Sequence, residues 1–191
     1  MAGPTHNGPM AKSAVSLPGL SSPAVGFEQP FEMLEACHER VHRSLELLRR
    51  IVVHVDEHGH DDKSRAAVGD VLRYFDIAGP LHHQDEELHV FPALLSHPDP
   101  LVPAAVAQLQ ADHVRMHWLW SRLRQILLVW RDDEAAGAIS DVERRLADDF
   151  INCYERHIPL EEAIAYPAAQ PGFSAADLDR IGAEMAARRR G

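Results

Sequence analysis

Cysteine is scarce in this sequence, with two residues in a chain of 191. Two cysteines cannot build a disulfide framework, so we expect a reducing, cytoplasmic setting. The length of the chain predicts one domain with tails. Long apolar runs are missing as well, and every run is far shorter than the roughly 18 residues that a membrane span needs. The N-terminus shows no positively charged start followed by an apolar core. We therefore expect neither a membrane partner nor a secretory signal.

Positive charge is also in short supply. The chain has 19 Lys and Arg against 29 Asp and Glu, which gives a formal net charge of −10. A protein that binds the phosphate backbone needs the opposite sign, so we expect no nucleic-acid partner. Histidine, in contrast, is abundant at 13 residues, and this number indicates metal or proton chemistry.

Alternation with a period of two, the pattern of half-buried strands, does not extend over any useful length. Apolar residues instead recur at spacings of three and four in four long stretches, which begin near Phe31, Val68, Val102 and Val142. With polar loops between them, these stretches predict an all-α fold, an antiparallel up-down-up-down four-helix bundle. We expect Gly79-Pro80 to kink the second stretch or to loosen one of its turns, because Pro80 has no N–H to donate.

The two ends of the chain differ from this bundle in composition. Residues 1–29 are rich in Gly, Pro and Ser and predict a flexible N-terminal segment. We assign residues 30–170 to the bundle and residues 171–191 to a short C-terminal capping helix. Ser174 and Asp177 form a capping-box pair at its start, and three arginines lie at its end, where the helix dipole favours positive charge.

The histidines lie in an internal repeat. Residues 82–92 (HHQDEELHVFP) and 157–167 (HIPLEEAIAYP) both fit H-x-x-x-E-E-x-x-x-aromatic-P and lie 75 positions apart. The same offset carries His38 onto His113 and His42 onto His117. The first two helices therefore repeat as the last two, around a pseudo-twofold axis.

Four of the repeated histidines, His38, His82, His113 and His157, each occupy the apolar stripe of their helix. A single histidine there is most often a core residue with satisfied hydrogen bonds. Four related by one offset indicate coordination, because a cation removes the cost of burying imidazoles and carboxylates without partners.

Two of these histidines have a glutamate one turn later, in the i,i+4 pairs His82/Glu86 and His157/Glu161. Two carboxylates with at least four imidazoles describe a two-metal site of mixed nitrogen and oxygen ligands. Such a donor set favours iron, manganese or zinc over calcium or magnesium, and the lack of thiolates argues against a structural zinc site.

From Phe31 to Pro167 the sequence resembles the hemerythrin-like HHE cation-binding family, in its bacterial type. The resemblance implies two non-haem iron ions inside a four-helix bundle. Carried over by position, the implied metal ligands are His38, His82, Glu86, His113, His157 and Glu161, with His117 as the further histidine that oxygen carriers use on the third helix. Oxygen carriers also have an aspartate five residues after the last histidine, whereas this chain has Glu161 four residues after His157. This spacing is more similar to that of the bacterial iron-centre repair proteins and iron-sensing domains than to that of the respiratory carriers.

We expect a protein that binds or senses oxygen, nitric oxide or iron, with peroxide as a further small ligand and with no turnover assigned. The alternative is a di-iron redox enzyme or an iron donor in oxidative or nitrosative stress defence and iron-centre repair. Counting ligands separates these functions, because seven protein ligands suit binding and six leave more room for exchange or redox chemistry.

Other histidines admit more than one interpretation. His42 and His117 lie on the flank of the apolar stripe, and each is either a direct ligand or a neighbour that orients one. Helical geometry places His83 and Glu87 about 100° from His82 and Glu86, so we expect them to face solvent or a neighbouring helix edge. We expect His54, His58 and His60 to belong to a solvated loop rather than to a weak metal site.

Overall fold

The structure is a computed structural model that describes residues 25–133 and 135–190. These residues form helices joined by short loops, with no strand among them, so the predicted all-α fold is confirmed. Most of the N-terminal segment predicted to be flexible, residues 1–24, lies outside the described residues. No helix within the described residues is long and apolar enough to cross a membrane.

The first long helix, α1 (Pro30–His58), starts with Pro30, whose missing N–H costs nothing in the first turn. It ends at Gly59, where φ is +77° and the backbone N–H donates to the Val55 carbonyl. This positive-φ backbone favours glycine because a side chain there strains against its own peptide units, although the surrounding space is open. The helix therefore includes His54 and His58, which the sequence analysis assigned to a loop.

The second rod is continuous but changes its helical type several times. It consists of α2 (Asp62–Arg73), η1 (Tyr74–Ala78), α3 (Gly79–Asp85), η2 (Glu86–Val90) and α4 (Phe91–Leu94). A reciprocal capping box between Asp61 and Ser64 starts α2.

The third and fourth rods are simpler. The third is α5 (Leu101–Asp132), and the fourth consists of α6 (Asp141–Leu160), η3 (Glu161–Ala165), α7 (Tyr166–Ala169) and the 3-10 turn η4 (Gln170–Gly172). The last helix, α8 (Ala175–Arg188), begins with the predicted capping box between Ser174 and Asp177, which is confirmed.

The three wide turns η1, η2 and η3 are π-helical, and each ends one residue before an X-Pro pair at Pro80, Pro92 or Pro167. In each turn the residue before the proline donates its N–H to the carbonyl five residues earlier. Proline has no N–H, and its ring crowds the carbonyl four residues back, so the helix widens locally. Two of these turns begin at Glu86 and Glu161, so the prolines of the repeat also determine the backbone at both glutamates.

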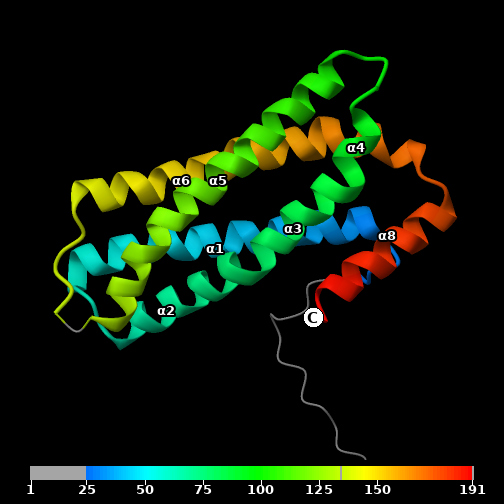
Figure 1. Ribbon diagram of the computed structural model, residues 1–191. Helices are drawn as coiled ribbons and strands as arrows, with labels where there is room; N and C mark the ends of the chain where they lie inside the picture. Colours follow the sequence, from blue (N-terminus) through cyan, green and yellow to red (C-terminus); the bar gives the residue numbers. More distant parts are fainter. Residues whose placement is uncertain (1–24, 134, 191) are drawn as a thin grey trace, which may run out of the picture.

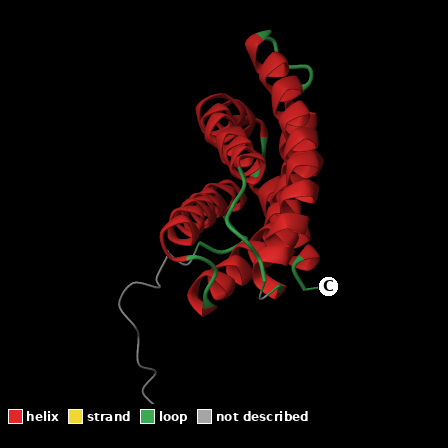
Figure 2. Ribbon diagram, turned by 90° about the vertical axis from the view of Figure 1, so that its left-hand side faces the viewer, coloured by secondary structure: helices red, strands yellow, loops and turns green. Residues whose placement is uncertain are grey.

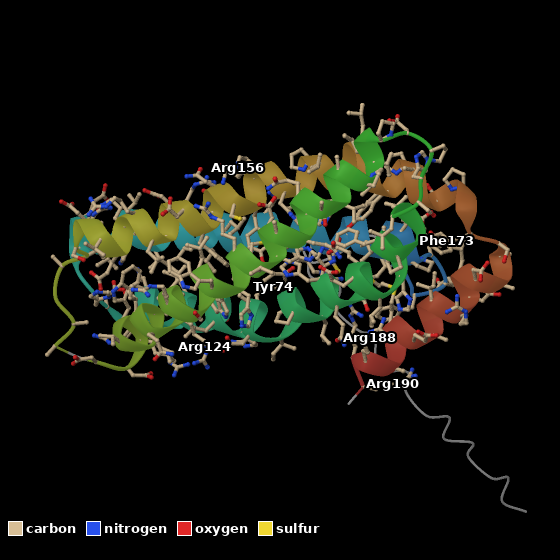
Figure 3. All side chains as sticks on the ribbon, turned by 45° about the horizontal axis from the view of Figure 1, so that its top comes forward. Tyr74, Arg124, Arg156, Phe173, Arg188 and Arg190 are labelled. Carbon is tan, nitrogen blue, oxygen red and sulfur yellow. The ribbon has the colours of Figure 1, made fainter. Side chains whose placement is uncertain are left out.

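The four rods lie side by side, and α8 folds back along the end of α1 (Figures 1 and 2). Gly182 permits this close approach, because a Cβ there would lie 1.8 Å from the Phe27 carbonyl oxygen. Side chains fill the space between the rods along their whole length (Figure 3).

The buried apolar residues form two clusters. One includes Leu48, Phe75 and Leu123, and the other includes Phe31, Phe91 and Leu109 together with Met185 of α8. Near the boundary between these clusters in the sequence, each rod carries buried polar residues of the repeat: His38 on the first, His82 and Glu86 on the second, His113 on the third, and His157 and Glu161 on the fourth. The fold thus encloses a polar layer between two apolar regions.

Candidate metal centre

The structure brings together the four histidines of the apolar stripes. The rings of His38 and His82 lie 4.9 Å apart, and those of His113 and His157 lie 4.7 Å apart. None of the four is more than 8% exposed. Each pair joins imidazoles from two different rods, so the pairs depend on how the helices pack.

Glu86 and Glu161 lie between the two pairs and are fully buried. Glu86 Oε1 is 3.3 Å from His82 Nε2, and Glu86 Oε2 is 3.4 Å from His113 Nε2. Glu161 Oε2 is 3.2 Å from His38 Nε2, and Glu161 Oε1 is 2.9 Å from His157 Nε2. Each carboxylate therefore reaches one imidazole of each pair, which is the arrangement that a bridging carboxylate needs.

Two overlapping groups of donor atoms result, and within each group the atoms lie within 4.8 Å of one another. One group is His38, His82, Glu86 and Glu161, and the other is Glu86, His113, His157 and Glu161. The glutamates belong to both groups. The six residues predicted from the repeat thus form one cluster with two halves.

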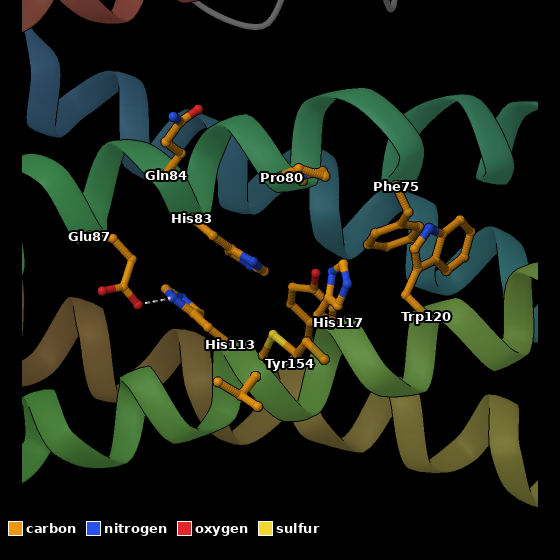
Figure 4. A pocket seen from close by; sticks show the side chains of 12 residues that line it. Phe75, Pro80, His83, Gln84, Glu87, His113, His117, Trp120 and Tyr154 are labelled. Carbon is orange, nitrogen blue, oxygen red and sulfur yellow. Dashed lines mark hydrogen bonds and ion pairs between the residues drawn. The ribbon is translucent and has the colours of Figure 1, made fainter.

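His83 joins this cluster, although the sequence analysis assigned it no role there. It lies on α3, its ring stacks on that of His113 at 4.1 Å, and its donor atom groups with those of His113 and His157 (Figure 4). The sequence analysis placed it away from the ligands, facing solvent or a neighbouring helix edge; the structure places it against His113 of α5 and within a donor group. The repeat could not identify His83, because its counterpart is Ile158; the adjacent histidine doublet was the available signal.

His42 and His117 are exposed, and the structure does not bring either of them into these donor groups. His117 instead lines a cavity beside His113. Its proposed place among the ligands therefore receives no support from the geometry.

Two further carboxylates, also related by the repeat, contact the ring nitrogens of His38 and His113 that face away from the cluster. His38 Nδ1 is 2.8 Å from Glu162 Oε1, and His113 Nδ1 is 3.0 Å from Glu87 Oε1. Glu87 and Glu162 are themselves 75 positions apart. A carboxylate on the far ring nitrogen fixes the tautomer and leaves Nε2 to face a cation.

Burial and the glutamates act on the imidazoles in opposite directions. Burial would lower the pKa values of His38 and His113, but Glu161 beside His38 and Glu86 beside His113 raise them. Burial prevails at two other histidines. It lowers the pKa of His82 to about 3, and it holds the pKa of His83 well below its ordinary value. Burial and the neighbouring Glu86 raise the pKa of Glu161 well above its ordinary range. At Glu86, burial alone would raise the pKa, but His82 and His113 together lower it. Imidazoles and carboxylates that share protons in one buried cluster form a site in which a cation can replace those protons.

Unpaired polar atoms inside the cluster also indicate a metal centre. Several buried polar atoms of the cluster make no hydrogen bond within the described residues: His82 Nδ1, His83 Nε2, Glu86 Oε2, and Glu161 Oε1 and Oε2. An unpaired buried polar group is costly, and coordination satisfies several such groups at once. The donor set contains imidazoles and carboxylates without thiolates, so it favours iron, manganese or zinc.

Comparison with known proteins agrees with this geometry. The profile of the hemerythrin HHE cation binding domain matches residues 29–169. The chain belongs to the hemerythrin HHE cation-binding domain family. This hemerythrin-like chain is also 33% identical over 163 residues to a Haemophilus influenzae protein named only as an uncharacterized protein, covering 85% of this chain and 91% of that one. Family membership confirms the resemblance drawn from the paired motifs and assigns a cation-binding function to the domain.

Proposed function

We propose that this hemerythrin-like domain holds two non-haem iron ions and binds or senses oxygen, nitric oxide or iron. The observation that carries the proposal is the position of Glu86 and Glu161, each of which reaches one imidazole from either half of the cluster. Manganese or zinc would suit the same donors. We also propose the up-down-up-down order of the bundle and its assignment to residues 30–170, with a flexible segment before it and a capping helix after it.

The ligands follow from the two donor groups. His38 and His82 would hold one ion, His113 and His157 the other, and the two glutamates would bridge them. We propose His83 rather than His117 as the seventh donor, because His83 is within reach of His113 and His157 and His117 is not. Seven protein ligands suit binding better than turnover.

Other residues of the chain orient these donors and shield them from water. Glu87 and Glu162 orient His113 and His38, and the two apolar clusters keep water away from both ends of the polar layer. When bound, two irons supply electrons and coordination positions for a diatomic molecule or peroxide. The alternative, a redox enzyme or iron donor for iron-centre repair, uses the same residues and differs in whether a substrate is turned over or metal is released.

Metal analysis of the full chain, isolated without chelator from iron-replete cells, tests the proposal. We expect about two irons per chain, as in other carboxylate-bridged di-iron bundles. Glu161→Gln should lose both ions, because the bridge serves both halves, and the surface variant Glu155→Gln should keep them. A reproducible value near zero or one in the unaltered chain would overturn the dinuclear proposal. Anaerobic reduction followed by air separates the functions: a reversible charge-transfer band supports binding, and irreversible bleaching with iron release supports donation.

A further inference from the structure

A cavity of about 390 Å³ opens beside the second half of the metal centre, between α3 and α5. The imidazoles of His83 and His113 lie at its inner end (Figure 4). The volume is large compared with the roughly 30 Å³ that one water molecule occupies in the liquid. A diatomic molecule would fill only a small part of it, so the cavity has room for an organic molecule.

The lining of this cavity is mainly apolar and aromatic, with Phe75, Pro80, Val114, Met116, Trp120 and Tyr154 around it. Among the described residues that line it, none is lysine or arginine, and Glu87 supplies a carboxylate. An anion would meet no lysine or arginine in this lining and would be repelled by Glu87. The lining therefore suits an uncharged molecule with an apolar body.

His83 is the most weakly held imidazole of the cluster. His38 and His113 each have a carboxylate hydrogen-bonded at Nδ1, from Glu162 and Glu87, and His157 Nδ1 lies 3.7 Å from Asp112. His82 Nδ1 and His83 Nε2 make no hydrogen bond within the described residues. His82 is nevertheless 2% exposed and its Nε2 lies 3.3 Å from Glu86, whereas His83 is only half-buried and has no carboxylate partner among the described residues. Since a carboxylate partner strengthens a histidine ligand, His83 is the donor that an incoming ligand displaces most easily.

The half of the centre that contains His38 and His82 is covered by a tyrosine. The Tyr166 ring stacks on that of His38 at 5.6 Å, and its hydroxyl reaches Glu86 and lies 3.3 Å from His38 Nε2. In the repeat Tyr166 corresponds to Phe91, which stacks on His113 without a hydroxyl. A second cavity of about 600 Å³ touches His38, but His38 Nδ1 is engaged there by Glu162 and Nε2 points to Glu161.

We propose that the cavity between α3 and α5 binds a small uncharged organic ligand whose donor atom reaches the metal held by His113 and His157, and that this ligand displaces His83. This inference rests on the proposed di-iron function and adds to it the side of entry, the ligand class and the exchangeable protein donor. Organic molecules of this class have a neutral donor atom on an apolar ring or chain.

Pyridine and nicotinate provide a matched pair of probes for the anaerobic iron(II)-loaded full chain. Both have the same ring nitrogen, and only nicotinate has a negative charge near neutral pH. Binding of either probe is measured by the charge-transfer absorption band that appears when its ring nitrogen coordinates iron(II). We expect pyridine to bind at least about tenfold more tightly than nicotinate, since electrostatic mismatch raises the cost of desolvating the anion.

Three variants locate the site. Val114→Phe, at an exposed position on the cavity rim, should weaken pyridine binding about tenfold or more by filling the entrance. Ala36→Phe fills the second cavity in the same way and should change binding by no more than about twofold, as expected of a surface substitution. His83→Ala should strengthen binding about tenfold, because the competing donor is gone.

Metal content is measured in every sample, so that the inference and the proposed function fail separately. Absence of metal from the unaltered chain overturns the proposed function and this inference with it. Two irons without a pyridine band overturn only the inference. Weakening by Ala36→Phe rather than Val114→Phe, or equal binding of nicotinate, overturns the assigned cavity or ligand class. Loss of pyridine binding in His83→Ala with both irons retained overturns the displacement of His83.

Discussion

The hydroxyl of Tyr166 donates a hydrogen bond to Glu86, a residue 80 positions earlier on the second rod. This contact joins the aromatic-Pro end of one repeat to the glutamate of the other. Phe91 occupies the equivalent position in the first repeat and has no hydroxyl, so this contact is one difference between the two halves. His83, whose counterpart is Ile158, is another.

Tyr166→Phe should keep both metals but shift the visible spectrum, because Glu86 loses its only phenol donor while its carboxylate remains. The unpaired buried oxygen should lower the free energy of unfolding of the metal-free chain by about 1–3 kcal/mol. Urea unfolding and metal analysis check both results. Tyr74→Phe removes a hydroxyl that donates to the Cys37 backbone carbonyl and contacts no side chain of the donor groups, so it should leave the spectrum unchanged. An unchanged spectrum in Tyr166→Phe would contradict the prediction.

His38 should matter more than His42, although they lie one turn apart on α1. His38 is 1% exposed and lies within the first donor group, whereas His42 is exposed and outside it. His38→Ala should lose at least one iron. His42→Ala should keep both and at most weaken affinity by about 10–100-fold, as changes around a ligand do. Metal loss in His42→Ala alone would mean that α1 is rotated relative to this assignment.

Chelation should loosen the fold, because the cluster loses the cation that satisfies its buried donors. A metal ion that binds only the folded state, at a free concentration of 100 times its Kd, adds about 2.7 kcal/mol to the free energy of unfolding. For a chain of this size that corresponds to roughly 5–11 °C in Tm. Calorimetry of loaded and chelated protein measures the difference. The double variant Glu86→Gln, Glu161→Gln serves as the control and should show no response to chelator; equal Tm values for the loaded and chelated unaltered chain would refute the coupling.

The C-terminal helix should stabilise the rod that carries Glu86. The buried Asp85 accepts two hydrogen bonds from Arg188, the last residue of α8, and forms an ion pair with Arg189, the next residue. Arg188→Ala should cost about 1–3 kcal/mol in urea unfolding, because Asp85 keeps only one of its two arginine partners. Arg180→Ala, on the exposed side of the same helix, removes surface ion pairs and should cost at most about 1 kcal/mol. Equal costs would mean that α8 contributes through its apolar side alone.

Asp61 should contribute a pH-dependent part of the stability through the N-cap of α2. The Ser64 backbone N–H, and then His54, lower the pKa of Asp61 from 3.8 to about 2. A depressed folded-state pKa stabilises the protein above the unfolded value, and this contribution is lost as the pH falls from about 4 to about 2. In metal-free protein, the difference in unfolding free energy between the unaltered chain and Asp61→Ala should therefore shrink across that interval. A difference that stays constant between these two pH values would contradict the prediction.

The sequence by itself determined the elements and most of the site. Spacings of three and four predicted the helices, because each helix must bury one face, and this signal is local. The offset of 75 residues identified His38, His82, Glu86, His113, His157 and Glu161 together, because a repeated fold places equivalent residues around one axis.

Only the tertiary structure decided how these residues are shared between the two halves. His38 pairs with His82, and His113 with His157, because those rods pack side by side, and no periodicity within one helix carries that information. A uniform rotation of 100° per residue also fails across the π turns at Glu86 and Glu161, where the prolines widen the helix. Packing likewise brought His83 to His113 and left His117 exposed. It also placed Arg188 on Asp85, because a buried charge finds its partner only when the last helix folds back.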